Sequence, residues 1–121
     1  MARILVVDDE HLMRNFMRRV LEREGHEVVE ADGGNQAMEE LSGGNFAVII
    51  TDLLMPTGRG MESITACRKR FPQTAIIAIS AVGAYLEVAE RLGAQRTLEK
   101  PFNRRELVAA VNACLGMSGG G

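Results

Sequence analysis

The chain has 121 residues, 46% of them apolar, and its 14 basic and 16 acidic residues give a formal net charge of −2. This length suits one domain with its own core, and the apolar fraction argues against intrinsic disorder. The small net charge argues against a nucleic-acid-binding protein that depends on bulk positive charge.

The N-terminal part of the chain predicts a strand followed by a helix. Arg3–Val7 is almost continuously apolar, which is typical of a parallel strand covered on both faces. The next segment repeats apolar residues at the spacing of a helix that packs on one side, at Met13, Phe16, Met17, Val20 and Leu21. Gly25 is expected to end this helix, because glycine readily adopts a positive φ.

The later segments repeat this alternation of strand and helix. Strands are predicted at Glu27–Ala31, Phe46–Thr51, Ala75–Ile79 and Arg96–Glu99. Helices are predicted at Asn35–Leu41, Gly60–Phe71 and Ala84–Leu92. A fifth helix is expected after Asn103, an N-cap candidate that has Glu106 three residues later as its capping-box partner.

Five such βα units predict an α/β fold. Because crossover connections are right-handed and helices cover both faces, we expect a doubly wound five-stranded parallel sheet of the flavodoxin-like (βα)5 class. The strand order 2-1-3-4-5 is the one known for this class. Residues 1–116 are expected to form this domain, and residues 117–121 a flexible tail or the start of a linker.

Targeting signals and cysteine usage bear on the cellular compartment. We expect no signal peptide, because the first strand follows directly after Met1 and Ala2, and no apolar run approaches the length of a membrane span. Cys67 and Cys114 have neither the spacing of a metal site nor that of a disulfide framework, and they are expected to be small core residues. We therefore expect a cytoplasmic protein.

Polar side chains follow four of the five predicted strands. They are Asp8 and Asp9 after the first strand, Asp52 after the third, Ser80 after the fourth and Lys100 after the fifth. The carboxyl ends of parallel strands lie at one edge of the sheet, where ligands bind, so these side chains should converge. Clustered carboxylates repel one another, and Mg²⁺, which prefers oxygen ligands, would relieve that repulsion. Carboxylates, Mg²⁺, a hydroxyl and a lysine together predict a phosphoryl-transfer site.

Each of these residues also has an ordinary structural explanation when taken alone. Asp8 and Asp9 could cap a helix and favour its dipole, and Asp52 could cap a turn. Ser80 could be a loop hydroxyl and Lys100 a solvated surface charge. Their shared position at strand ends favours a common site over these separate explanations.

With these motifs the chain resembles the receiver domain of two-component response regulators, from Arg3 to about Leu115. The segments that carry the resemblance are Ile4–Glu10, Thr51–Pro56, Ile79–Ala81, Gly93–Ala94 and Lys100–Phe102. Together, in this order and at this spacing, they are specific for that family.

The resemblance implies a role for each acidic residue of the site. Asp52 would be the phosphoacceptor that attacks the phosphohistidine of a sensor histidine kinase or of a histidine phosphotransfer protein. Asp8, Asp9 and Asp52 would hold Mg²⁺ together with the backbone carbonyl of Leu54. The product would be an acyl phosphate that water hydrolyses, so the protein would catalyse its own phosphorylation and dephosphorylation without being a turnover enzyme.

The remaining site residues also take roles from the resemblance. Lys100 would contact the phosphoryl oxygens, and Ser80 would turn toward the phosphoryl group after transfer. The resemblance also implies a cis peptide bond between Lys100 and Pro101. Most receivers have an aromatic residue where this chain has Thr97, so we expect a smaller rearrangement of the fifth strand on activation.

The resemblance also implies partners. A downstream protein would bind the face formed by the fourth helix, the fifth strand and the fifth helix. We expect a monomer before phosphorylation and no direct contact with nucleic acid or with a membrane. The alternatives are a receiver-like scaffold that works without phosphorylation, an aspartyl-nucleophile phosphatase and a flavin-binding module. The phosphatase would carry its nucleophile on the first strand, and the flavin module would need a glycine-rich phosphate loop there.

Overall fold

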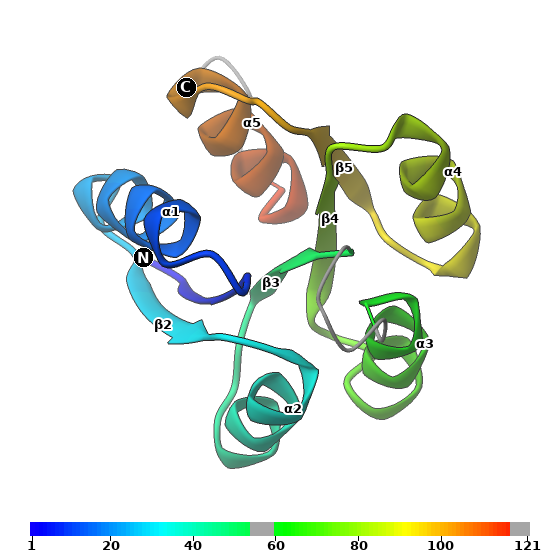
Figure 1. Cartoon of the computed structure of the whole chain (residues 1–121). Coiled ribbons are helices and arrows are strands. Elements are labelled where there is room, and N and C mark those ends of the chain that lie inside the picture. The colour runs from blue at the N-terminus through cyan, green and yellow to red at the C-terminus, as the bar shows by residue number, and fades with distance from the viewer. Residues whose placement is uncertain (54–59, 117–121) are drawn as a thin grey trace.

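The computed structural model describes residues 1–53 and 60–116, in which strands and helices alternate from end to end (Figure 1). In chain order the elements are β1 Arg3–Val7, α1 His11–Arg23, β2 Glu27–Ala31, α2 Gly34–Gly43, β3 Val48–Asp52, α3 Gly60–Arg70, β4 Ala75–Ser80, α4 Gly83–Leu92, β5 Arg96–Glu99 and α5 Arg104–Cys114. None of the described helices combines the length and the apolar character that crossing a membrane requires.

The sheet has the predicted architecture. Its described strands are all parallel and lie in the order β2-β1-β3-β4-β5. Figure 1 shows α1 and α5 on one face of the sheet and α2, α3 and α4 on the other. The predicted doubly wound, flavodoxin-like fold with order 2-1-3-4-5 is therefore confirmed.

Each face of the sheet has its own apolar core, because successive side chains of a strand point to opposite faces. In β1, Ile4 and Val6 pack with residues of α1 and α5, whereas Leu5 and Val7 pack with residues of α2, α3 and α4. These four side chains are fully buried. The predicted burial of this strand on both faces is confirmed. Packing on both faces holds the strands in place, and with them the edge of the sheet where their carboxyl ends lie.

Two strands extend one residue further toward the site than their apolar runs predict. β3 ends at Asp52 and β4 at Ser80, because the ladder of hydrogen bonds continues through both polar residues. Asp52 pairs with Ile79, and the N–H of Leu53 donates to the carbonyl of Ile79 at 3.0 Å. Asp52 and Ser80 are therefore held by the sheet rather than by loops. β3 also begins later than predicted, at Val48.

Helix ends follow the predicted signals. Gly25 has a φ of 89°, the positive value expected for a residue just past the end of α1. At the start of α5, the Asn103 side chain accepts a hydrogen bond from the N–H of Glu106 at 2.8 Å, and the Glu106 carboxylate accepts one from the N–H of Asn103 at 3.0 Å. The predicted capping box is confirmed.

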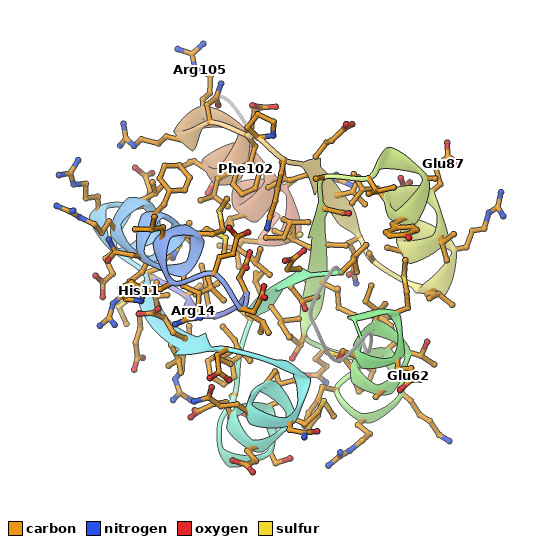
Figure 2. All side chains as sticks on the ribbon, viewed as in Figure 1. His11, Arg14, Glu62, Glu87, Phe102 and Arg105 are labelled. Atoms are coloured by element: carbon orange, nitrogen blue, oxygen red, sulfur yellow. The ribbon has the colours of Figure 1, made fainter. Side chains whose placement is uncertain are left out.

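Replacing Asn103 with alanine should lower the free energy of unfolding by about 1 kcal/mol, because the N–H of Glu106 at the start of α5 loses its capping partner. Urea unfolding followed by circular dichroism would measure the change. Arg105→Ala is the matched control, since this side chain points away from the molecule in the same helical turn (Figure 2). Equal losses in the two variants would show that the cap itself contributes nothing.

Candidate functional site

A buried cluster of charged groups lies where β1, β3 and β5 end. Lys100, directly after β5, places its Nζ 2.9 Å from Asp8 Oδ2 and 3.2 Å from Asp52 Oδ2. The Nζ also lies 3.4 Å from Oε1 of Glu10. Asp8 is fully buried and Asp52 nearly so, whereas the side chain of Lys100 keeps 14% of its surface exposed. The structure therefore brings together the predicted residues Asp8, Asp52 and Lys100.

Burial and neighbouring charges shift the pKa values of Asp8 and Lys100. Burial raises the pKa of the Asp8 carboxyl above its usual value, and hydrogen bonds from the Glu10 N–H and from Lys100 only partly offset this. The Asp52 carboxylate adds to the rise by repulsion. Burial lowers the pKa of Lys100, but the hydrogen bond to Asp8 and the charges of Asp8 and Asp52 outweigh it, so the net shift is upward. Lys100 is therefore charged at neutral pH and offsets part of the negative charge of the acids.

The acidic residues of this cluster fit a divalent cation. Oxygen atoms of Asp8, Glu10 and Asp52 all lie within 4.8 Å of one another. A set of carboxylate oxygens suits Mg²⁺, which takes hard oxygen ligands and keeps several waters. The donor set also carries more negative charge than one lysine neutralises, so a bound cation would lower its electrostatic energy.

One predicted ligand lies elsewhere, and one member of the group was not predicted. Asp9 is exposed and does not belong to the group that could hold a metal, so its role as a ligand stays a prediction. Glu10, for which the sequence predicts no role beyond its place in the motif, belongs to that group. The signal that could have found it is the run of three consecutive acids. The fourth predicted ligand, the carbonyl of Leu54, lies outside the described residues.

Ser80 lies at the same edge, one residue beyond the partner of Asp52 in the neighbouring strand. Its side chain is fully buried, and its Oγ accepts a hydrogen bond from the N–H of Val82 at 3.0 Å. Its carbonyl accepts a hydrogen bond from the N–H of Lys100 at 2.8 Å, which ties the end of β5 to the end of β4. The Lys100–Pro101 peptide bond is cis, as the resemblance implied.

Comparison with protein families and curated proteins gives consistent matches. A family model described as the response regulator receiver domain matches residues 4–112. The transcriptional regulatory protein CpxR of Escherichia coli (strain K12) is 37% identical over 117 residues, which are 95% of this chain and 50% of CpxR. SrrA of Staphylococcus aureus (strain NCTC 8325 / PS 47), also a transcriptional regulatory protein, is 39% identical over 114 residues, or 93% of this chain and 47% of SrrA. The chain thus spans about half the length of these relatives.

Solved structures agree with this result. The response regulator TrrA of Thermotoga maritima, solved in complex with Mg²⁺-BeF, aligns with a TM-score of 0.86 at 33% identity and covers 94% of this chain and 99% of its own. The chemotaxis response regulator CheY4 of Vibrio cholerae aligns with a TM-score of 0.87 at 30% identity, over 94% of this chain and 98% of its own.

Proposed function

This chain belongs to the response regulator receiver domain family, and we propose that it accepts a phosphoryl group on Asp52 and changes conformation to control the binding of a partner. The donor would be the phosphohistidine of a sensor histidine kinase or of a histidine phosphotransfer protein. One observation carries the proposal: Lys100 contacts the carboxylates of both Asp8 and Asp52, which are buried together at the carboxyl edge of the sheet.

The chemistry follows from the positions of these groups. An oxygen of the Asp52 carboxylate attacks the phosphorus atom, the bond to the donor's imidazole nitrogen breaks, and the imidazole leaves with the electron pair. Phosphoryl transfer depends mainly on positioning and on neutralising the charge of the phosphoryl oxygens. Lys100 supplies one positive charge at this place, and Mg²⁺, when held by Asp8 and Asp52, supplies two more. Hydrolysis of the acyl phosphate by water later restores the Asp52 carboxylate.

The matched relatives are regulators rather than turnover enzymes, which disfavours the phosphatase alternative. The buried lysine–carboxylate cluster disfavours a scaffold that never carries phosphate, because burying like charges together is costly without a function for them. The protein would therefore catalyse only its own phosphorylation and dephosphorylation. The proposal also keeps the cytoplasmic location that the sequence predicted.

The output surface in this proposal is the face formed by α4, β5 and α5. Tyr85 and Val88 on the outer side of α4 are each 41% exposed, and Leu92 is 37% exposed. Such an apolar stripe on an exposed helix suits a protein partner. Ser80, at the end of β4 and bonded to the loop before α4, connects the site to this face, and Thr97 of β5 is half-buried within it. The unphosphorylated chain is proposed to be a monomer that makes no direct contact with nucleic acid.

Asp52→Asn should abolish phosphorylation. Incubation of the wild type with acetyl phosphate and Mg²⁺ should add one phosphoryl group to the intact mass, and the variant should gain less than about 1% of that amount because it lacks the nucleophile. Asp32→Asn is the matched control, since Asp32 follows β2 and is exposed outside the cluster. It should behave as the wild type, and removing Mg²⁺ with EDTA should stop the reaction in both.

Two results would contradict the proposal. Phosphoryl gain by Asp52→Asn would place the acceptor on another residue. No gain by the wild type, with Mg²⁺ bound and with a histidine kinase also offered as donor, would favour the scaffold alternative.

A further inference from the structure

We propose that Arg14 and Glu30 act as a positioning clamp that fixes the peptide between Asp8 and Asp9 and so sets the affinity of the acidic site for its divalent cation. This inference rests on the proposed function, because it concerns the same site. Neither residue belongs to the cluster that binds Lys100 or to the group that could hold a metal. Both would act through the backbone of Asp8.

Arg14 joins three elements of the fold. Its Nη1 donates a hydrogen bond to the backbone carbonyl of Asp8 at 2.6 Å, and its Nε donates one to Oε1 of Glu30 at 3.1 Å. Arg14 lies on the side of α1 that faces β2, the strand that carries Glu30 (Figure 2). The side chains of Arg14 and Glu30 are only 15% and 24% exposed, so this pair is better shielded from solvent than an ordinary surface ion pair.

The contact completes a set of bonds that fixes Asp8. Its N–H donates to the carbonyl of Ala31 at 3.2 Å, which extends the pairing of β1 with β2. Its Oδ1 accepts from the N–H of Glu10 at 2.9 Å, and its Oδ2 accepts from Lys100 at 2.9 Å. Arg14 holds the remaining polar group, the carbonyl. The backbone of Asp8 is thus held by residues of α1 and β2, whereas its carboxylate is held by the N–H of Glu10 and by Lys100.

The carbonyl of Asp8 controls the direction in which the chain continues. A peptide bond is planar, so fixing this oxygen also fixes the N–H of Asp9 and the path toward Glu10. Glu10 supplies both the N–H that holds the Asp8 carboxylate and a carboxylate of the group that could bind a metal. A change at Arg14 is therefore transmitted to two carboxylates that it does not touch.

A guanidinium suits this position better than an ammonium does. Its planar fork donates in two fixed directions at once, here to a carbonyl and to a carboxylate, whereas a lysine is a flexible point charge. Glu30 also pairs with Arg18, whose Nη1 lies 2.9 Å from Oε2 of Glu30 but whose side chain is 45% exposed. Burial would raise the pKa of Glu30, but hydrogen bonds from Arg18 and Arg14 outweigh it and keep the pKa below its usual value. The clamp is therefore charged on both sides at neutral pH.

Charge alone predicts the opposite effect from positioning. Arg14 is a cation close to the site, so removing its charge would by Coulomb's law favour a bound Mg²⁺. If Arg14 acts by holding the Asp8 carbonyl, its removal disorders the ligands and weakens Mg²⁺ binding instead. The sign of the change in affinity therefore separates the two explanations.

The test is a titration with Mg²⁺ alone, followed by backbone amide NMR, on Arg14→Gln, Arg14→Lys and the control Arg18→Gln. Arg18 also binds Glu30 but does not contact Asp8. The Kd for Mg²⁺ should rise about tenfold in both Arg14 variants, as is typical when an outer partner of a metal ligand is removed. The control should stay within about twofold of the wild type, because an exposed ion pair contributes little and the contacts of Arg14 with Asp8 and Glu30 remain. A Kd that is unchanged or lower in Arg14→Gln, or raised equally in Arg18→Gln, would overturn the proposal.

A second readout uses the metal-free protein. Amide hydrogen exchange of Glu10, whose N–H is bonded to Asp8, should accelerate in Arg14→Lys, while urea unfolding shows whether the global fold is retained. If the Arg14 variants fail to fold, Glu30→Gln replaces them and should raise the Kd in the same way. In the double variant Arg14→Lys/Glu30→Gln the two effects should not add, since both break one clamp. Additive changes in Kd, or an unchanged amide exchange rate at Glu10, would contradict the proposed clamp.

These measurements do not depend on phosphoryl transfer. A wild type that binds Mg²⁺ but gains no phosphoryl group, even from a histidine kinase, would refute the proposed function and leave the clamp to be judged by its own Kd values. A phosphorylated wild type with unaltered Mg²⁺ binding in the Arg14 variants would refute the clamp alone.

Discussion

Replacing Lys100 with methionine is expected to slow phosphorylation of Asp52 by about 10²–10³-fold, the usual cost of removing one group that stabilises developing negative charge. Methionine keeps much of the length of the side chain but lacks the ammonium that lies within 3.4 Å of three carboxylates. The same variant should bind Mg²⁺ more tightly, because the cation no longer competes with a lysine for Asp8 and Asp52. Intact mass against time measures the first effect, and a Mg²⁺ titration measures the second.

The opposite signs of these two effects make the prediction specific. A substitution that merely disturbed the fold would weaken both Mg²⁺ binding and phosphorylation. Lys69→Met is the matched control, since Lys69 is the other lysine of the chain and is exposed near the end of α3. It should change neither quantity. If Lys100→Met weakened Mg²⁺ binding, Lys100 would be acting as a structural support for the carboxylates rather than as a counter-charge.

Much of the fold could be predicted because apolar patterns report burial. β1, β2 and β5 have the predicted bounds, and the apolar run Ile4–Val7 of β1 is fully buried. Asp52 and Ser80 were predicted to follow their strands but belong to them. A polar residue in the sequence suggests the start of a loop, whereas the hydrogen-bond ladder continues through it when its side chain has partners inside the protein.

The sequence predicted where the site lies but not which of the acids after β1 belong to it. The rule that parallel strands end at one edge was enough to bring Asp8, Asp52 and Lys100 together. Which of the acids after β1 comes within reach of Lys100 and Asp52 depends on the backbone of the loop before α1, and the sequence does not specify that path. Both Asp9 and Glu10 are exposed, but the structure places only Glu10 in the group that could hold a metal.

The contact of Arg14 with Glu30 shows another limit of the sequence. On the helical pattern Arg14 is one of several charged residues on the polar side of its helix. Its partner lies 16 residues away on β2, and its second acceptor is a backbone carbonyl, which has no sequence signature. Only the packing of α1 over β1 and β2 makes the pair meaningful for the site.

Replacing Gly60 with alanine should lower the free energy of unfolding by about 1–3 kcal/mol, the usual cost of overpacking, and should also weaken Mg²⁺ binding. A Cβ at Gly60 would lie 2.6 Å from the carbonyl oxygen and 2.7 Å from the Cα of Leu53, the residue after the proposed phosphoacceptor Asp52. These are backbone atoms, so the start of α3 or the end of β3 must move. Leu53 is bonded through its N–H to Ile79, and a shift there reaches Asp52 directly.

Gly43→Ala is the matched control for this close approach. Gly43 is also helical, at the end of α2, and a Cβ there would meet nothing within 4 Å. Since alanine favours a helix over glycine, that variant should be neutral or slightly more stable, with unchanged Mg²⁺ affinity. Urea unfolding and a Mg²⁺ titration on both variants separate the outcomes. The contrary result is that Gly60→Ala loses stability with unchanged Mg²⁺ affinity. That result would mean that the start of α3 moves while β3, which carries Asp52, keeps its position. The sheet alone would then position the site.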